Sequence, residues 1–131
     1  MGITMTHQPD DKAAGDSLDK VTPYYFDAVK LVGTGNSTGL FGAGVALYYF
    51  STRSPDVLSL IKCDAFIYLV GVCLFSISYF CLSVFTFIRT NPARTIANIQ
   101  PWLNVGVVSA LLSFGVWWIG TICAGAVFAR L

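Results

Sequence analysis

Residues 65–88 read AFIYLVGVCLFSISYFCLSVFTFI, a stretch without a single charged side chain. Residues 31–52 and 95–129 share this property, and all the charged residues of the chain, 8 basic and 7 acidic, lie between or outside the three stretches. Each stretch is long enough to cross the hydrocarbon core of a bilayer, which takes about 20 helical residues. A soluble helix would instead carry charges along its water-facing side. The pattern therefore predicts an integral membrane protein.

The composition agrees with this prediction and excludes other classes. The chain has 131 residues, of which 55% are hydrophobic and only 11% are charged. A globular core of this size cannot bury so much apolar surface, whereas membrane lipids can cover it. The net charge is +1 and the basic residues form no cluster, which argues against nucleic acid as a partner.

The expected fold class is an all-α membrane protein with three transmembrane helices in a small bundle. Residues 22–131 form this domain, with spans at about 31–52, 65–88 and 102–128. Residues 1–21 are polar and acidic, and we expect them to form a disordered tail.

Short interfacial helices are expected beside the second and third spans. Ser54-Pro55-Asp56 has a capping residue, a proline at the first helical position and an acid in the first turn, which predicts a helix start. Asn91-Pro92 is a turn signal, and residues 93–100 suit a short helix at the membrane surface.

The first span is the weakest of the three, because residues 33–39 read GTGNSTG. One interpretation is a single helix, with or without a kink, from Pro23 to about Thr52. The other is a surface helix that ends near Gly33, followed by a short span from about Ser37. We favour the continuous helix, since the short span would be only about 24 Å long, less than the usual thickness of the core.

The distribution of lysine and arginine predicts the orientation of this multi-pass protein. Five basic residues lie on the amino-terminal side of the membrane and three on the opposite side. The positive-inside rule then places the N-terminus in the cytoplasm, and a bacterial protein of this kind would lie in the inner membrane.

Small residues recur at helical spacing in two spans and are the candidate helix-contact residues. In the first span these are Gly35, Gly39, Gly42 and Ala46. In the third span a stripe with alternating steps of four and three contains Gly106, Ala110, Ser113, Trp117, Gly120, Ala124 and Val127. Such stripes let helix backbones approach closely inside lipid, within one chain or between chains. Gly106, Ser113 and Gly120 are the main candidates there, and we expect Trp117 to fill the space beside glycines of a neighbouring helix.

Asn36, Ser37 and Thr38 form the most polar cluster inside a span. Polar side chains at depth cost free energy unless they find partners. A hydrogen bond between helices is the preferred interpretation, and a contact with a substrate or an ion is the alternative.

Residue types that support chemistry at depth are missing from the sequence. The single histidine is His7, far from any span, and the charge-free stretches contain no ionisable acid or base. Haem ligation, proton coupling and nucleophilic catalysis need such groups. None of the four cysteines forms a Cys-x-x-Cys pair. We therefore expect no catalytic residue, no metal, no cofactor and no enzymatic activity.

The favoured functional prediction is a small membrane protein that acts through helix–helix contacts, as an accessory or regulatory subunit of a membrane complex. Its partners would be membrane lipids and other membrane subunits or copies of itself. The alternative is an oligomeric pore-forming or membrane-permeabilising protein of the holin-like or effector kind. A third interpretation, a carrier of small molecules or lipids, depends only on the aromatic residues of the second span.

Overall fold

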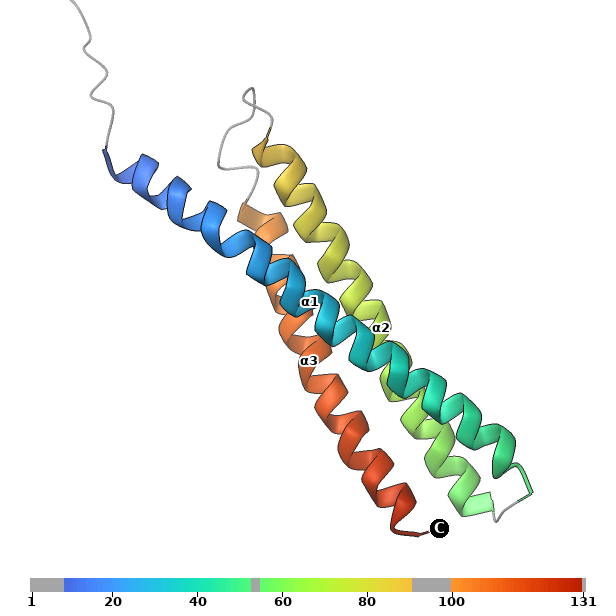
Figure 1. The fold of residues 1–131 in the computed structure, drawn as a ribbon. Coiled ribbons are helices and arrows are strands. Elements are labelled where there is room, and N and C mark those ends of the chain that lie inside the picture. The colour runs from blue at the N-terminus through green and yellow to red at the C-terminus, as the bar shows by residue number, and fades with distance from the viewer. Residues whose placement is uncertain (1–8, 53–54, 91–99, 131) are drawn as a thin grey trace, which may run out of the picture.

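Three long helices make up the computed structural model of this protein, which describes residues 9–52, 55–90 and 100–130. They are α1 (Pro9–Tyr49), α2 (Pro55–Arg89) and α3 (Gln100–Phe128), and no strand occurs within the described ranges. The helices lie side by side in an up-down-up bundle, in which α1 and α3 run in one direction and α2 runs in the other (Figure 1). The expectation of an all-helical bundle is confirmed.

Helix α1 begins at Pro9, well before Pro23, where the continuous helix was expected to start. Residues 9–21 are helical, so the prediction of a disordered tail was wrong for them, while residues 1–8 lie outside the described part. Local signals explain the early start. Proline is favoured at the first helical position, acids follow it at Asp10 and Asp11, and alanines follow these.

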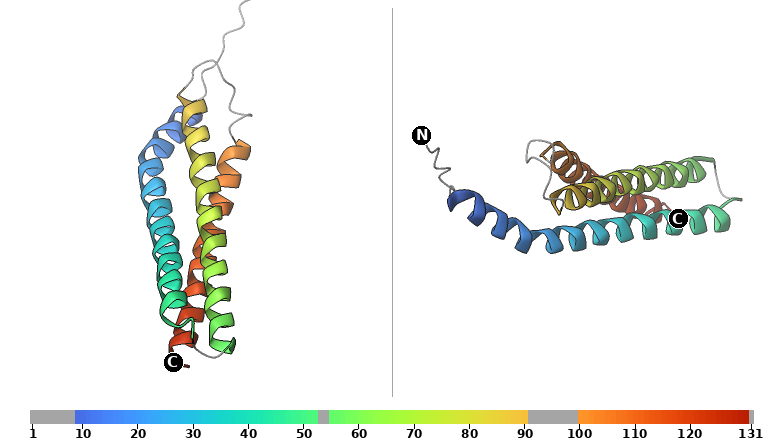
Figure 2. Two further views of the ribbon diagram at one scale, coloured as in Figure 1. Left: turned by 90° about the vertical axis from the view of Figure 1, so that its right-hand side faces the viewer. Right: turned by 90° about the horizontal axis from the view of Figure 1, so that it is seen from above.

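The glycine-rich segment of residues 33–39 lies inside one uninterrupted helix. The continuous interpretation of this region is therefore confirmed. Pro23 lies inside the same helix, and α1 bends along its amino-terminal part in the right-hand view of Figure 2. A proline inside a helix removes a backbone hydrogen bond and favours such a bend. On the amino-terminal side of Pro23, Asp19 Oδ1 forms an ion pair with Arg89 Nη2 of α2 at 2.7 Å.

The starts of the other two helices follow the sequence signals closely. Helix α2 begins at Pro55 with Asp56 in its first turn, and it continues without a break through the second span to Arg89. Helix α3 begins at Gln100, one residue before Pro101. The short helix expected over residues 93–100 falls almost entirely outside the described residues.

Two helices, α2 and α3, are long and apolar enough to cross a membrane. Only 28% and 17% of their most apolar segments are buried inside the protein. The core helix of a soluble protein would bury most of such a segment. Helix α1 is longer but does not meet the same criterion. Two candidate spans are therefore present in the described residues, and the third span stays a prediction.

The bundle is held together along one seam of α2. Its members recur with alternating steps of four and three residues, which is the rhythm of closely packed helices. All are buried except Phe75, which is half-buried. The seam consists of Asp64, Tyr68, Gly71, Phe75, Ser78, Leu82 and Phe85.

Candidate functional site

A polar junction joins all three helices near the middle of the bundle. The Asn36 side-chain amide of α1 donates to the Ser113 hydroxyl of α3 at 3.1 Å and to the Ser113 carbonyl at 3.3 Å. Ser113 Oγ in turn donates to the Gly71 carbonyl of α2 at 2.8 Å. Asn36 and Ser113 are both 0% exposed. We call this group, Asn36, Ser113 and Gly71, the polar junction.

The junction requires a glycine at position 71. The Asn36 side-chain oxygen lies where a β-carbon of residue 71 would be, so any larger residue would displace the amide. The amide nitrogen also donates to the Val32 carbonyl at 3.1 Å, which fixes its direction. Asn36 Oδ1 has no hydrogen-bond partner among the described residues. The nitrogen side of Asn36 is therefore fully used in holding the helices together.

A second polar crossing links α2 to α3. Ser78 Oγ donates to the Gly106 carbonyl at 2.7 Å, and Ser78 is 0% exposed. The close approach depends on Gly106, whose β-carbon would meet Leu82 at 3.1 Å. A hydroxyl buried in this way avoids the cost of an unpaired polar group in an apolar environment.

Glycines of α1 and α3 make room for aromatic rings of neighbouring helices. A β-carbon on Gly35 would lie 2.8 Å from Trp117 Nε1, so Trp117 occupies the space beside a glycine as the sequence predicts. Tyr68 of α2 lies between Gly39 of α1 and Gly120 of α3, and a β-carbon on either glycine would collide with its ring. These glycines therefore serve contacts inside one chain.

The side of α1 that packs against the other helices differs slightly from the stripe of small residues predicted from the sequence. The buried positions of α1 include Val29, Gly33, Asn36 and Ala43, whereas Gly42 is exposed and nothing lies within 4 Å of where its β-carbon would be. Ala46 is half-buried. The difference has a physical reason, because the polar Asn36 side chain is directed to the inside of the bundle, and this sets the rotation of the helix.

The three polar candidates of the first span lie in different surroundings. Asn36 is in the polar junction, while Ser37 and Thr38 are exposed on the outward face of α1. Thr34 is exposed on the same face and donates to the Lys30 carbonyl of its own helix at 2.9 Å. The cluster is therefore divided between the interior and the outer surface.

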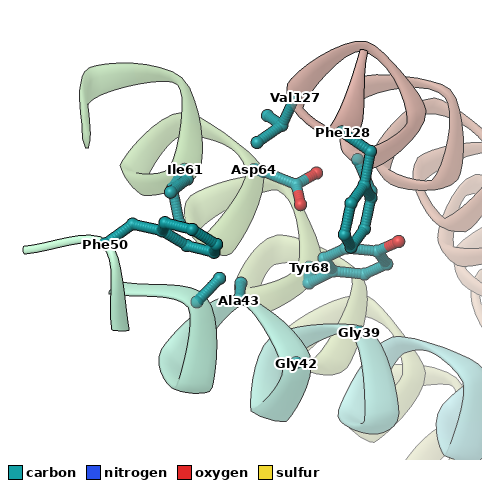
Figure 3. Close-up of a pocket in the computed structure, with 11 residues that line it drawn as sticks. Gly39, Gly42, Ala43, Phe50, Ile61, Asp64, Tyr68, Val127 and Phe128 are labelled. Atoms are coloured by element: carbon teal, nitrogen blue, oxygen red, sulfur yellow. The ribbon is translucent and has the colours of Figure 1, made fainter. Parts of the chain in front are cut away.

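A pocket of about 200 Å³ lies at the end of the bundle where α1 ends, α2 begins and α3 ends (Figure 3). Three aromatic side chains, one carboxylate and small or aliphatic residues line it. We call it the end pocket, and its lining is Gly39, Gly42, Ala43, Ala46, Phe50, Ile61, Asp64, Tyr68, Ala124, Val127 and Phe128.

Asp64 is the unusual member of this pocket. Its carboxylate projects from α2 toward the space between the aromatic rings (Figure 3). The residue is only 6% exposed, and Oδ1 has no hydrogen-bond partner among the described residues. Leaving an ionised carboxylate buried and unpaired costs several kcal/mol. The end pocket is therefore the part of the described chain where a charge is most in need of a partner.

Four contact or pocket residues of α2 were not among those predicted from the sequence: Asp64, Tyr68, Gly71 and Ser78. The signal was present, because these residues share the alternating spacing of the α2 seam. It was hidden because α2 is apolar on all sides, so a single face does not stand out. In the sequence, Asp64 lies beside Lys62 and Cys63 at the edge of a charge-free stretch, and this position does not indicate that its side chain is buried.

Comparison of the chain with protein-family models, with curated proteins and with solved structures finds no match. Function must therefore be argued from the geometry of the bundle, its outer surface and the end pocket.

Proposed function

We propose that this is a small multi-pass membrane protein that acts through helix–helix contacts, as an accessory or regulatory subunit of a membrane complex. The observation that supports the proposal most is the outward face of α1. Large apolar side chains stand exposed on it, with 74% of Leu31, 75% of Phe41 and 80% of Tyr48 accessible. These residues lie on the same side of α1, at helical spacing.

Hydroxyl groups lie in the middle of the same face. Thr34, Ser37 and Thr38 are all exposed there, between Leu31 and Phe41. The Thr34 hydroxyl bonds to the Lys30 carbonyl of its own helix, whereas hydrocarbon offers the Ser37 and Thr38 hydroxyls no partner and a neighbouring helix would. A helix that is too polar to face lipid alone is better accommodated against another protein. This favours a partner helix on the outer side of α1, either from another subunit or from a second copy.

The interior of the bundle supports a role in contacts over a role in chemistry. The buried polar side chains Asn36, Ser78 and Ser113 bond to backbone or side-chain atoms of other helices. Groups used in this way hold the fold, and they are not available to bind a substrate at depth without breaking it. The proposed role therefore places activity on the outer surface.

Affinity purification of the full chain from its native membrane in a mild detergent tests this proposal. We expect a stoichiometric membrane partner to copurify with the parent and to be lost from Phe41→Ala. Phe66→Ala, which truncates a 66%-exposed ring on α2, is the matched control and should retain the partner. Gly39→Leu is unsuitable, because the new side chain would collide with Tyr68 of the same chain. A parent that runs as a monomer without any partner would contradict the proposal.

A second candidate function is a pore formed by several copies. The exposed line of Thr34, Ser37 and Thr38 favours it, since hydroxyls from neighbouring copies could line a narrow water path. Release of a dye from liposomes discriminates the two candidates. A pore-forming protein releases the dye at high density and loses this activity in Ser37→Leu, whereas an accessory subunit leaves the liposomes tight.

A further inference from the structure

We infer that the end pocket binds an organic ammonium group, carried either by a lipid headgroup or by a free amine. The inference concerns a ligand site within one chain, so it does not depend on the partner proposed for the outer face of α1.

The Asp64 carboxylate has the properties of a side chain that binds a ligand. It is more than nine-tenths buried, it faces the pocket, and Oδ1 accepts no hydrogen bond from any described residue (Figure 3). Structural carboxylates in apolar surroundings are normally paired or capped. A cation in the pocket would supply the missing charge and the missing donor.

The cations of the described chain do not fill this role. Lys62 and Arg130, the basic residues described at this end of the bundle, are exposed, and neither forms an ion pair with Asp64. The ion pairs found among the described residues involve Asp19 with Arg89 and Asp27 with Lys30. None of these described cations therefore neutralises an ionised Asp64, and a cation from elsewhere would have to do so.

The aromatic lining selects an organic cation. Phe50 of the α1–α2 turn, Tyr68 of α2 and Phe128 of α3 surround the space that the carboxylate faces. Aromatic faces attract ammonium groups, and this attraction strengthens when water is excluded. The remaining lining is alanine, glycine and aliphatic side chains, which suit the carbon substituents of an amine.

A metal ion fits the pocket poorly. Magnesium and calcium take six or more oxygen ligands, and Asp64 is the only carboxylate among the described residues of the lining. Among the described residues there is no group of three or more histidine, cysteine or acidic side chains that could hold a metal. An organic ammonium group, which one carboxylate and several aromatic faces attract, fits this lining better than a metal ion does.

Isothermal titration of the purified full chain in an amine-free detergent tests the inference. The probes are choline and ethylamine, and the control compound is dimethylbutanol, the neutral isostere of choline. We expect at least one cationic probe to bind the parent, and Asp64→Asn to weaken this binding by about tenfold or more. Dimethylbutanol should bind the parent at least about tenfold more weakly than choline.

A pair of glycine variants tests whether a loss of binding is caused by misfolding. No atom lies within 4 Å of where the β-carbon of Gly42 or of Gly44 would be, but only Gly42 lines the end pocket. Gly42→Leu should fill the pocket and abolish binding, while Gly44→Leu should bind as the parent does. Equal affinity of parent and Asp64→Asn, or of Gly42→Leu and Gly44→Leu, would overturn the inference.

The source of the ammonium group is found by changing the lipid. In nanodiscs of phosphatidylglycerol with added phosphatidylcholine, native mass spectrometry should show phosphatidylcholine retained by the parent and not by Asp64→Asn if the ligand is a headgroup. If only free choline or ethylamine binds in phosphatidylglycerol nanodiscs, the ligand is a soluble amine. Failure of both cationic probes to bind in detergent and of phosphatidylcholine to be retained would overturn the inference.

Discussion

Asn36 of the polar junction and Asp64 of the end pocket are both buried polar residues of the same three-helix bundle, yet they differ in whether their polar atoms find partners. At the junction, the Asn36 amide nitrogen donates to acceptors on α1 and α3, and Ser113 passes the connection on to α2. In the end pocket, the Asp64 carboxylate faces aromatic rings and no donor contacts its Oδ1. Burial alone therefore does not distinguish a structural polar group from one that awaits a ligand.

The difference lies in the space around each group. Gly71 lets the Asn36 side chain come directly against the α2 backbone, so the junction is closed. Two glycines line the end pocket: Gly39 makes room for the Tyr68 ring, whereas Gly42 faces open space. A neutral amide with one unpaired oxygen is a small cost, whereas an unpaired carboxylate is a large one. The first group stabilises the bundle and the second limits its stability.

The largest expected effect comes from adding one methyl group at each of these glycines. Gly71→Ala places a carbon where Asn36 Oδ1 lies, so the amide must move and its hydrogen bonds break. We expect a loss of about 2 kcal/mol or more in the free energy of unfolding. Gly42→Ala meets nothing and should stabilise the helix by up to about 1 kcal/mol. Unfolding in detergent measures both, and equal effects of the two variants would contradict the comparison.

A smaller effect is expected at the second polar crossing, where two serines of α2 form a matched pair. Ser78 donates to Gly106 of another helix, whereas Ser76 donates to Val72 of its own helix and is exposed. Ser78→Ala should cost about 1 kcal/mol, the range measured for hydrogen bonds between membrane helices. Ser76→Ala should stay within about 0.5 kcal/mol of the parent. If both serines behave alike, hydrogen bonds between helices do not hold the bundle.

The smallest perturbation is chemical labelling, which leaves the bundle unchanged and tests whether the middle of α2 lies inside the membrane. Cys63 and Cys73 are both exposed and free, but Cys63 is beside Asp64 and Cys73 is in the middle of the apolar stretch. In membranes, a membrane-impermeant maleimide should label Cys63 and spare Cys73, while both should react after denaturation. Labelling of Cys73 in intact membranes would argue against α2 as a span.

Some of the fold could be predicted because local signals and the global packing agree. The stripe of α3 was visible because small residues recur on one side of that helix, and in the structure every member is buried or half-buried. The start of α2 at Pro55 follows from the proline and the acid after it. These signals are local, so they do not depend on knowing the neighbouring helices.

Other parts depend on contacts between helices and were missed or misplaced. Residues 9–21 were judged by their polar composition, which says little about whether a helix with favourable end charges will form. The packed face of α1 was assigned from small residues alone, whereas Asn36 determines which side faces inward. The role of Asp64 depends on what α1 and α3 place opposite it, and no pattern within α2 contains that information.

Two buried polar residues thus have different roles: Asn36 holds the helices together, and Asp64 is the residue that we infer to bind a ligand. The most direct measurement compares the melting temperatures of Asn36→Ala and Asp64→Asn in one amine-free detergent, each with and without choline. We predict that Asn36→Ala melts several degrees lower than the parent and is still stabilised by choline. Asp64→Asn should melt at or above the parent temperature and lose the choline effect. A lower melting temperature for Asp64→Asn with an unchanged choline effect would contradict the claim.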